Sequence, residues 1–422
     1  MYKFSIIILG GSILENNVKK NFIWNMIGSL TSAIPSLFFL IIVARVNGKS
    51  EAGVFTFAFS LASFFQVIAY YSGRTFQVTN RDKNINNSDF LYNRITTTII
   101  MLIIVIAYLL LKGYNNYKSL IIILFVIYRF IEALCDSFYA IIQQNDELYK
   151  VGISMFCKGL ISIVLFFIID LLTKSIILSI IAIVTVYLII LIFYDIKNCK
   201  NLLIIKKYDS SKNIKLLIMG FSIFVFTFLT QYILNAPRYS IDNYLSSSDQ
   251  AIYGIIVMPA TLIVLCSQFI IQPFLVDINN KIKKEKYKDL LYTSIKIIFA
   301  VAVIGIIAIG VAYLFGVSLL EFVYNIKLDK YLLSLIIIIA GAVFFSISFI
   351  ISTILIALRK NTIQIVFYII GSVFIYFCSN YLVANYRVLG AAMSYGLTMF
   401  LLFALYMIYY FIYITKKIKE CA

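Results

Sequence analysis

Residues 176–194 read IILSIIAIVTVYLIILIFY, an apolar stretch without a charged side chain. About 20 such residues are enough for an α-helix to cross the hydrocarbon core of a bilayer. Similar stretches recur along the chain, since 62% of its 422 residues are hydrophobic and only 13% are charged. A water-soluble fold of this size cannot bury so much apolar side chain. The sequence therefore predicts an all-α polytopic membrane protein.

About twelve apolar stretches are long enough to be transmembrane helices. Short polar intervals separate them, as is typical of a multi-pass protein. The predicted spans are 22–44, 52–73, 95–111, 119–142, 151–169, 176–194, 214–236, 252–274, 295–316, 332–357, 361–380 and 389–413.

Lys and Arg concentrate in every second interval between these spans. One set of intervals includes Lys281–Lys288 and the basic segment 195–215, whereas the opposite set carries fewer cations. Cytoplasmic loops hold the excess of Lys and Arg in membrane proteins. We therefore expect both termini to lie in the cytoplasm. The net charge of +17 is then explained without nucleic acid as a partner.

The basic segment 195–215 divides six predicted spans from six. Transporters are often built from two such halves, with the substrate path between them. We expect an N-terminal lobe at 1–194 and a C-terminal lobe at 216–422, joined by this cytoplasmic linker. Residues 1–14 resemble a short signal peptide, but no convincing cleavage site follows, so an interfacial segment is expected there.

Sequence signatures of an enzyme or a cofactor site are absent. The chain has no GxxxxGK[ST] motif and no His, and its six cysteines form no cluster with metal-ligand spacing. The outside loops are too short to hold a catalytic domain. The sequence therefore predicts a protein that is not an enzyme, with no cofactor and no metal. Its function must lie between the helices.

Span 119–142 carries polar side chains at helical spacing, and two of its charges fall near its middle. A charge there is costly if it faces lipid, so the polar face must meet protein or a wet cavity. This face consists of Arg129, Glu132, Asp136, Tyr139 and Gln143.

Two interpretations of this face stay open. It can be an internal ladder of ion pairs, with Arg129 beside Glu132 one turn away and Asp136 opposite Lys158 on the next helix. It can equally contact the substrate or a coupling ion, because ionisable groups inside a membrane are usually functional.

Span 214–236 continues into a second polar stripe. Pro237 is expected to break the helix beside Arg238, which would free backbone groups for a cavity or water. Arg238 then either pairs with Asp242 at the interface or binds an anionic group, and both interpretations stay open. The stripe consists of Thr227, Gln231, Asn235, Arg238 and Asp242.

Arg45 lies near the end of a span, where interfacial anchoring is the default explanation. The planar fork of arginine is nevertheless the side chain best suited to a phosphate. A cavity that held Arg45, Arg129 and Arg238 with scattered amides would suit a ligand with a diphosphate and sugars.

Several stretches of the chain resemble Wzx-type polysaccharide flippases, and the resemblance covers nearly the whole sequence. They are Asn21-Phe-Ile-Trp24-Asn25-Met-Ile-Gly28-Ser29, Arg45-Val-Asn-Gly48, Glu51-Ala-Gly53-Val-Phe-Thr-Phe-Ala58, Asn235-Ala-Pro237-Arg238-Tyr239-Ser-Ile-Asp242 and Val388-Leu-Gly390-Ala391-Ala392-Met-Ser-Tyr-Gly396.

This resemblance implies the fold of the multidrug/oligosaccharidyl-lipid/polysaccharide exporter superfamily, with two six-helix lobes around a central cavity. The implied protein is a flippase of a bacterial cytoplasmic membrane that works by alternating access. Its implied substrate is an undecaprenyl-diphosphate-linked oligosaccharide for O-antigen, capsule or exopolysaccharide biosynthesis. The polysaccharide polymerase and assembly proteins are implied partners, and H⁺ or Na⁺ is an implied coupling ion.

The family's cationic cavity maps onto Arg129, Arg238 and Arg45, and its acidic coupling residue maps onto Glu132 or Asp136. Two rival functions remain. A multidrug or cation antiporter of the same fold would favour acidic and aromatic cavity residues, whereas the candidate lining here is balanced or basic. A polysaccharide polymerase is expected to need a long outside loop, and this chain has none.

Overall fold

The computed structural model describes residues 19–32, 34–80, 82, 84–271 and 274–420, and this part of the chain contains helices and no strands. The signal-like segment 1–14 lies outside the described residues. Ten of the helices described are long and apolar enough to cross a membrane. The prediction of an all-α polytopic fold is confirmed.

The count of about twelve spans follows from two further features. Helix α16 (Asn361–Glu420) is broken at Arg387, where φ is 54° and ψ is −133°, so it comprises two successive helices. Helix α6 (Asn116–Gln144) is also long enough to span a bilayer, but Arg129, Glu132 and Asp136 interrupt its apolar character.

The chain divides into two compact units. Unit 1 contains the residues up to Asn47 together with Ala58–Phe224, and unit 2 contains Gly48–Phe57 together with Val225–Ala422. Two helices, α3 (Lys49–Tyr70) and α10 (Ser210–Tyr244), therefore contribute residues to both units.

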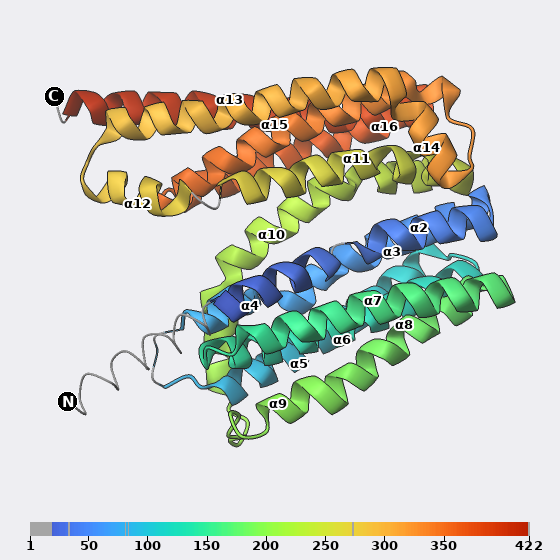
Figure 1. The fold of residues 1–422 in the computed structure, drawn as a ribbon, viewed down its shortest axis with the longest axis horizontal. Coiled ribbons are helices and arrows are strands. Elements are labelled where there is room, and N and C mark those ends of the chain that lie inside the picture. The colour runs from blue at the N-terminus through green and yellow to red at the C-terminus, as the bar shows by residue number, and fades with distance from the viewer. Residues whose placement is uncertain (1–18, 33, 81, 83, 272–273, 421–422) are drawn as a thin grey trace. The chain divides into compact units, whose positions relative to one another are not determined.

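Unit 1 is built around α6, which contacts most of the other helices of this unit (Figure 1). Its other elements, besides residues 19–32 and its shares of α3 and α10, are α2 (Pro35–Val46), α4 (Gly73–Val78), α5 (Asn87–Lys112), α7 (Leu148–Thr173), α8 (Ile176–Ile190), the π-helical turn η1 (Leu191–Ile196) and α9 (Lys197–Cys199).

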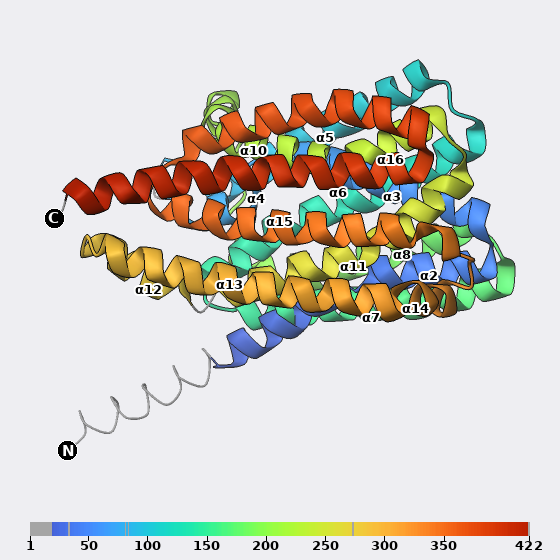
Figure 2. The ribbon, with the colours of Figure 1, turned by 90° about the horizontal axis from the view of Figure 1, so that it is seen from above.

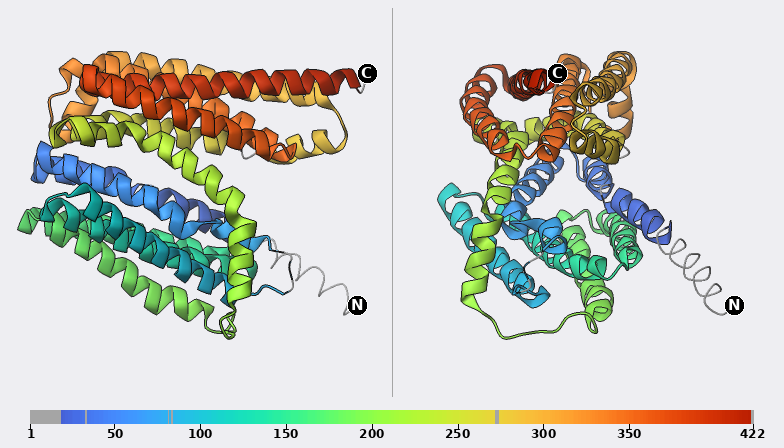
Figure 3. Two further views of the ribbon diagram at one scale, coloured as in Figure 1. Left: turned by 180° about the vertical axis from the view of Figure 1, so that it is seen from behind. Right: turned by 90° about the vertical axis from the view of Figure 1, so that its left-hand side faces the viewer.

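Unit 2 is built around α15 (Leu332–Ala357), which contacts α11, α13 and α16. The helices coloured orange and red run alongside one another in Figures 2 and 3. The other elements of unit 2 are α11 (Ser247–Ile271), α12 (Leu275–Lys283), α13 (Tyr287–Val311), η3 (Ala312–Gly316), α14 (Val317–Tyr324) and η4 (Asp329–Tyr331).

Glycines, which carry no side chain, let helices approach closely, as is usual in membrane bundles. A Cβ atom built on Gly152 of α7 would lie 2.1 Å from the carbonyl oxygen of Trp24, and one built on Gly159 would lie 2.4 Å from that of Thr31. Residues 19–32 therefore cross α7 backbone to backbone. On the lipid side, large apolar side chains such as Leu111, which is 87% exposed, remain uncovered.

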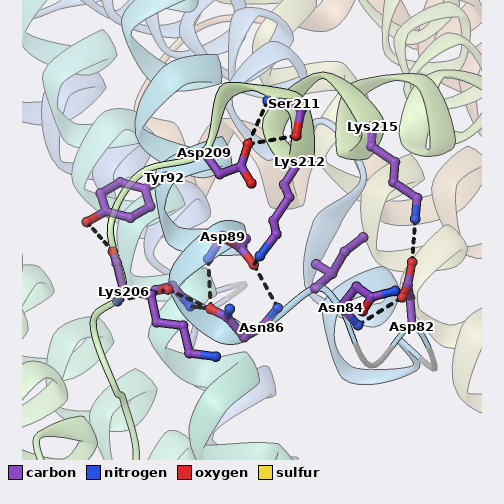
Figure 4. A network of polar contacts seen from close by, with 12 residues as sticks. Asp82, Asn84, Asn86, Asp89, Tyr92, Lys206, Asp209, Ser211, Lys212 and Lys215 are labelled. Carbon is purple, nitrogen blue, oxygen red and sulfur yellow. Dashed lines mark hydrogen bonds and ion pairs between the residues drawn. The ribbon is translucent and has the colours of Figure 1, made fainter.

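The beginning of α10 is held on unit 1 by a polar network (Figure 4). Asn86 caps α5 by accepting from the backbone N–H groups of Ser88 and Asp89. Lys212 lies 3.6 Å from the carboxylate of Asp89, and the buried amides of Asn93 and Asn213 are joined at 2.6 Å. The start of α10 is therefore part of unit 1.

Candidate functional site

The polar face of α6 begins with an ion pair. Nη1 of Arg129 donates to Oε2 of Glu132 at 2.5 Å, as the three-residue spacing predicts. Nη2 of Arg129 donates to Oγ of Ser63 at 2.7 Å, and Nε2 of Gln66 donates to Glu132 at 2.8 Å. The guanidinium also lies 4.5 Å from the ring centre of Phe59. The structure therefore brings Arg129 and Glu132 together as an ion pair, and contact of this face with a substrate or a coupling ion stays a prediction.

The predicted pair between Asp136 and Lys158 is wrong. Nζ of Lys158 donates to Asp195 at 2.5 Å, to the hydroxyl of Tyr139 at 2.8 Å and to Sγ of Cys135 at 3.0 Å. These three contacts use all three ammonium protons, so none is left for Asp136. Asp195 was assigned to the linker from sequence, but η1 and α9 continue the helix past it.

Asp136 pairs with Arg94 of α5 instead, with Nη2 of Arg94 at 3.2 Å from the carboxylate. Nη1 of Arg94 donates to the carbonyl oxygens of Ala69, at 3.0 Å, and of Tyr70. Sequence reasoning placed Arg94 in a cytoplasmic interval and missed this contact. The signal that locates it is the capping sequence at Asn86, which starts α5 two turns before Arg94.

Each of these three buried cations in unit 1 is therefore neutralised by a carboxylate. Removing one partner of a buried ion pair leaves an uncompensated charge, which typically costs about 3–5 kcal/mol. The pairs of Arg129, Arg94 and Lys158 thus hold α3, α5, α6, α7 and η1 together. None of them offers an unshared positive charge to an anionic ligand.

Arg238 of α10 has different surroundings. The sequence predicted a break at Pro237, and this prediction is wrong: α10 continues through Pro237 to Tyr244. Membrane helices tolerate an internal proline because neighbouring groups satisfy the freed carbonyl. Nη1 of Arg238 lies 3.4 Å from the backbone oxygen and 3.5 Å from Oγ1 of Thr56 in α3. Only neutral oxygens therefore accept from this guanidinium.

No carboxylate among the described residues lies within ion-pair distance of Arg238. The alternative in which Arg238 pairs with Asp242 is therefore wrong, although the continuous helix does keep Asp242 in the same row. An arginine in a membrane helix is costly unless an anion, a polar lining or water compensates it. Arg238 is consequently the best-placed group for an anionic ligand.

Gln231 and Asn235 share the stripe with Arg238 but bind each other. Nδ2 of Asn235 donates to the backbone oxygen of Gln231 at 2.9 Å and lies 3.4 Å from its Oε1. Both side chains are half-buried. Arg45 lies exposed in the last turn of α2, the position of an interfacial anchor. Their roles in substrate binding stay predictions.

The part of the chain that the structure describes holds no group of His, Cys, Asp and Glu side chains that could bind a metal. Its five cysteines, Cys135, Cys157, Cys199, Cys266 and Cys378, are free. The surroundings of Arg238 thus include a hydroxyl and two amides, those of Thr56, Gln231 and Asn235.

No known family profile matches the sequence. The chain is 23% identical over 406 residues to the capsular polysaccharide biosynthesis protein CapF of Staphylococcus aureus, covering 93% of this chain and 98% of CapF. Its fold is similar to that of a multidrug resistance MATE family transporter of the MOP superfamily, with a TM-score of 0.70 and 11% identity over 94% of this chain and all of the other.

The lipid II flippase MurJ is similar as well, with a TM-score of 0.67 and 16% identity over 92% of this chain and 87% of MurJ. At these identities the two structures show the fold alone. The chain is therefore a multi-pass membrane protein with the fold of MOP-superfamily transporters, and its structural neighbours are transporters and flippases.

Proposed function

We propose that this protein is a flippase that moves an undecaprenyl-diphosphate-linked oligosaccharide across a bacterial cytoplasmic membrane by alternating access. The repeat unit would serve the biosynthesis of O-antigen, capsule or exopolysaccharide. Both termini would face the cytoplasm, and a polymerase with its assembly proteins would take over the product. The observation that carries this proposal is the guanidinium of Arg238, which no carboxylate compensates.

The chemistry of such a substrate fits the surroundings of Arg238. A diphosphate carries negative charge that must be matched on its way across the membrane, and an arginine fork can bind two phosphate oxygens at once. The amides of Gln231 and Asn235 lie on the same helix and can exchange their mutual contact for saccharide hydroxyls. The prenyl chain, which is as apolar as lipid, can stay in the bilayer.

The comparisons support the same proposal from another direction. One relative is named for capsular polysaccharide biosynthesis, and one structural neighbour is named as a flippase of a lipid-linked molecule. A multidrug antiporter of this fold is the main rival. An organic cation needs an unshared negative charge, whereas Glu132, Asp136 and Asp195 in unit 1 each face a cation. Asp170 of α7 is an exception, because it accepts from the neutral side chains of Asn47 and Ser179 and forms no ion pair within the described part of the chain. The charge pattern along α6 nevertheless favours an anionic substrate.

Coupling to H⁺ or Na⁺ is proposed to involve Glu132. Its side chain is 25% exposed, more than that of Asp136 or Asp195, and it accepts from both Arg129 and Gln66. A proton on this carboxylate would weaken its ion pair with Arg129 and so change the strength of a contact between α6 and α3. Asp136 remains the second candidate.

The proposal is tested by extracting lipid-linked saccharides and surface polysaccharide from cells that lack the protein. Completed, unpolymerised units should accumulate on the inner leaflet while surface polymer disappears. Cells with Arg238→Gln should resemble the deletion, whereas Lys417→Gln, which removes a cation at the end of α16, should restore export. Single units that stall on the outer leaflet would instead identify a missing polymerase.

A further inference from the structure

Helix α11 carries two buried polar side chains without hydrogen-bond partners. Gln250 is 3% exposed, and neither its amide oxygen nor its amide nitrogen is bonded. Tyr253 is 1% exposed, and its hydroxyl is likewise unbonded. Buried polar groups are nearly always hydrogen-bonded, because leaving water costs free energy that only a partner restores. A buried polar group without a partner needs water, a ligand or a rearranged neighbour to satisfy it.

The helix face that carries these groups approaches Thr56, which Arg238 also approaches. Gln250, Tyr253 and Gly254 share one face of α11 because they are three and four residues apart. The phenol of Tyr253 lies within electrostatic range of the Arg238 guanidinium. Gly254 contacts Thr56, since a Cβ atom built on it would lie 2.7 Å from Oγ1 of that residue, and Arg238 approaches the same oxygen. Arg238 and Gly254, which adjoins Tyr253 in sequence and is one turn from Gln250, therefore meet at Thr56.

A short segment of α3 covers this face of α11. Gly48–Phe57 belongs to unit 2, whereas α3 continues from Ala58 in unit 1. A Cβ atom built on Gly53 would lie 1.7 Å from the backbone oxygen of Ser247, so the two helices touch backbone to backbone. Gln250 lies between Ser247 and Gly254 on the same face, and both of these residues meet the segment. The segment therefore covers Gln250.

We propose that Arg238, Gln250 and Tyr253 form a binding site for the diphosphate of a lipid-linked saccharide, which Gly48–Phe57 covers in the state described here. This inference rests on the proposed function. The Arg238 fork would bind phosphate oxygens, and the amide nitrogen of Gln250 and the hydroxyl of Tyr253 would donate to them. The amide oxygen of Gln250 can accept from a saccharide hydroxyl. Withdrawal of the segment opens the site.

Two near-isosteric substitutions test the binding groups. Tyr253→Phe and Gln250→Met remove polar atoms that have no partner in this structure, so the purified variants should unfold at the wild-type temperature or above it. Each should nevertheless bind undecaprenyl diphosphate in detergent micelles about tenfold more weakly. Undecaprenol, which lacks the phosphates, provides the background. Ser346→Ala is the matched control, because it removes another buried, unbonded hydroxyl of unit 2.

The outcomes separate the inference from the proposed function. Wild-type affinity in Tyr253→Phe and Gln250→Met, with affinity lost in Arg238→Gln, would overturn the inference and leave the proposed function standing. Wild-type affinity and export in all three variants would overturn both. An equal loss in Ser346→Ala would show a general packing effect and would also overturn the inference.

An engineered disulfide tests whether the segment Gly48–Phe57 must move away from α11 before the ligand binds. In a variant without native cysteines, Thr56→Cys and Gly254→Cys would place two thiols together, since a Cβ atom at Gly254 lies 3.2 Å from that of Thr56. Disulfides need Cβ atoms about 3.5–4.5 Å apart, which a small shift provides. Oxidation should abolish binding of undecaprenyl diphosphate, and reduction should restore it, whereas oxidant should not affect either single-cysteine variant. Undiminished binding in the oxidised protein would contradict the proposal that Gly48–Phe57 closes the binding site.

Discussion

The ammonium of Lys158 lies 2.5 Å from the carboxylate of Asp195, and the two side chains are 2% and 0% exposed. Ser154 adds a hydrogen bond of 2.6 Å to the same carboxylate. A pair this deep depends on both partners, because either charge alone would be buried without compensation. The contact ties α7 to the π-helical turn η1 and fixes the end of α8.

Asp195→Asn should lower the free energy of unfolding by about 3–5 kcal/mol, because it leaves the Lys158 ammonium unpaired. The double replacement Lys158→Met with Asp195→Leu should recover most of that loss. Unfolding of the purified protein in micelles measures both. Lys150→Ala, which opens the partly exposed pair with Glu147, should change the value by about 0.5 kcal/mol or less. Equal losses in the double and single variants would contradict this account.

A double-mutant cycle distinguishes the partner of Asp136. Arg94→Met and Asp136→Asn should couple by about 1–3 kcal/mol in unfolding free energy, since the two side chains touch. Lys158→Met and Asp136→Asn should be additive within about 0.5 kcal/mol. The reverse pattern would restore the pairing expected from the sequence.

Gly152→Ala should destabilise the protein by about 1–3 kcal/mol, because the new Cβ atom would lie 2.1 Å from the backbone oxygen of Trp24. Gly310→Ala in α13 is the control, since a Cβ atom there meets nothing within 4 Å. It should leave stability unchanged or raise it slightly. Thermal unfolding of the two variants in the same detergent measures both effects. Similar melting temperatures would contradict the close backbone contact between α7 and residues 19–32.

The contact between Asp82 and Lys215 should make stability depend on pH. Lys215 donates to the Asp82 carboxylate at 2.6 Å, and the N–H of Asn84 donates at 2.9 Å, so the pKa of Asp82 lies below its usual value (Figure 4). A lowered pKa stabilises the folded state above the ordinary carboxyl pKa, and this stabilisation disappears as the pH falls through the lowered pKa.

Asp82→Asn should therefore unfold more readily than the wild type near neutral pH, and the difference should vanish at acidic pH. High salt should shrink the difference, because both groups are near water. Unfolding curves from neutral to acidic pH measure it. A difference that persists unchanged under strongly acidic conditions would show that the ion pair is not its cause.

Periodicity and charge were enough to predict the transmembrane helices, the partnership of Arg129 with Glu132 and the separation of spans 361–380 and 389–413. The two spans 361–380 and 389–413 are separated by one residue with a strained backbone, Arg387, inside α16. These features depend on neighbours in sequence, so a one-dimensional pattern contains them.

The contacts of Lys158 and Arg238 could not be predicted in the same way. Asp195 reaches Lys158 only because the π-helical turn carries the helix beyond its apolar stretch. Arg238 lacks a carboxylate partner because its row on α10 faces Thr56 of α3, far away in sequence. Pairing across helices depends on rotation and depth, which hydropathy does not specify.

The most direct measurement of the central claim is the movement of a fluorescent undecaprenyl-diphosphate-linked saccharide between the leaflets of vesicles that contain the purified protein. The wild type should transfer it, Arg238→Gln should reduce the rate to that of empty vesicles, and Ser346→Ala should retain it. Transfer by Arg238→Gln at the wild-type rate would contradict the role of Arg238, and no transfer by the wild type under an imposed H⁺ or Na⁺ gradient would contradict the flippase itself.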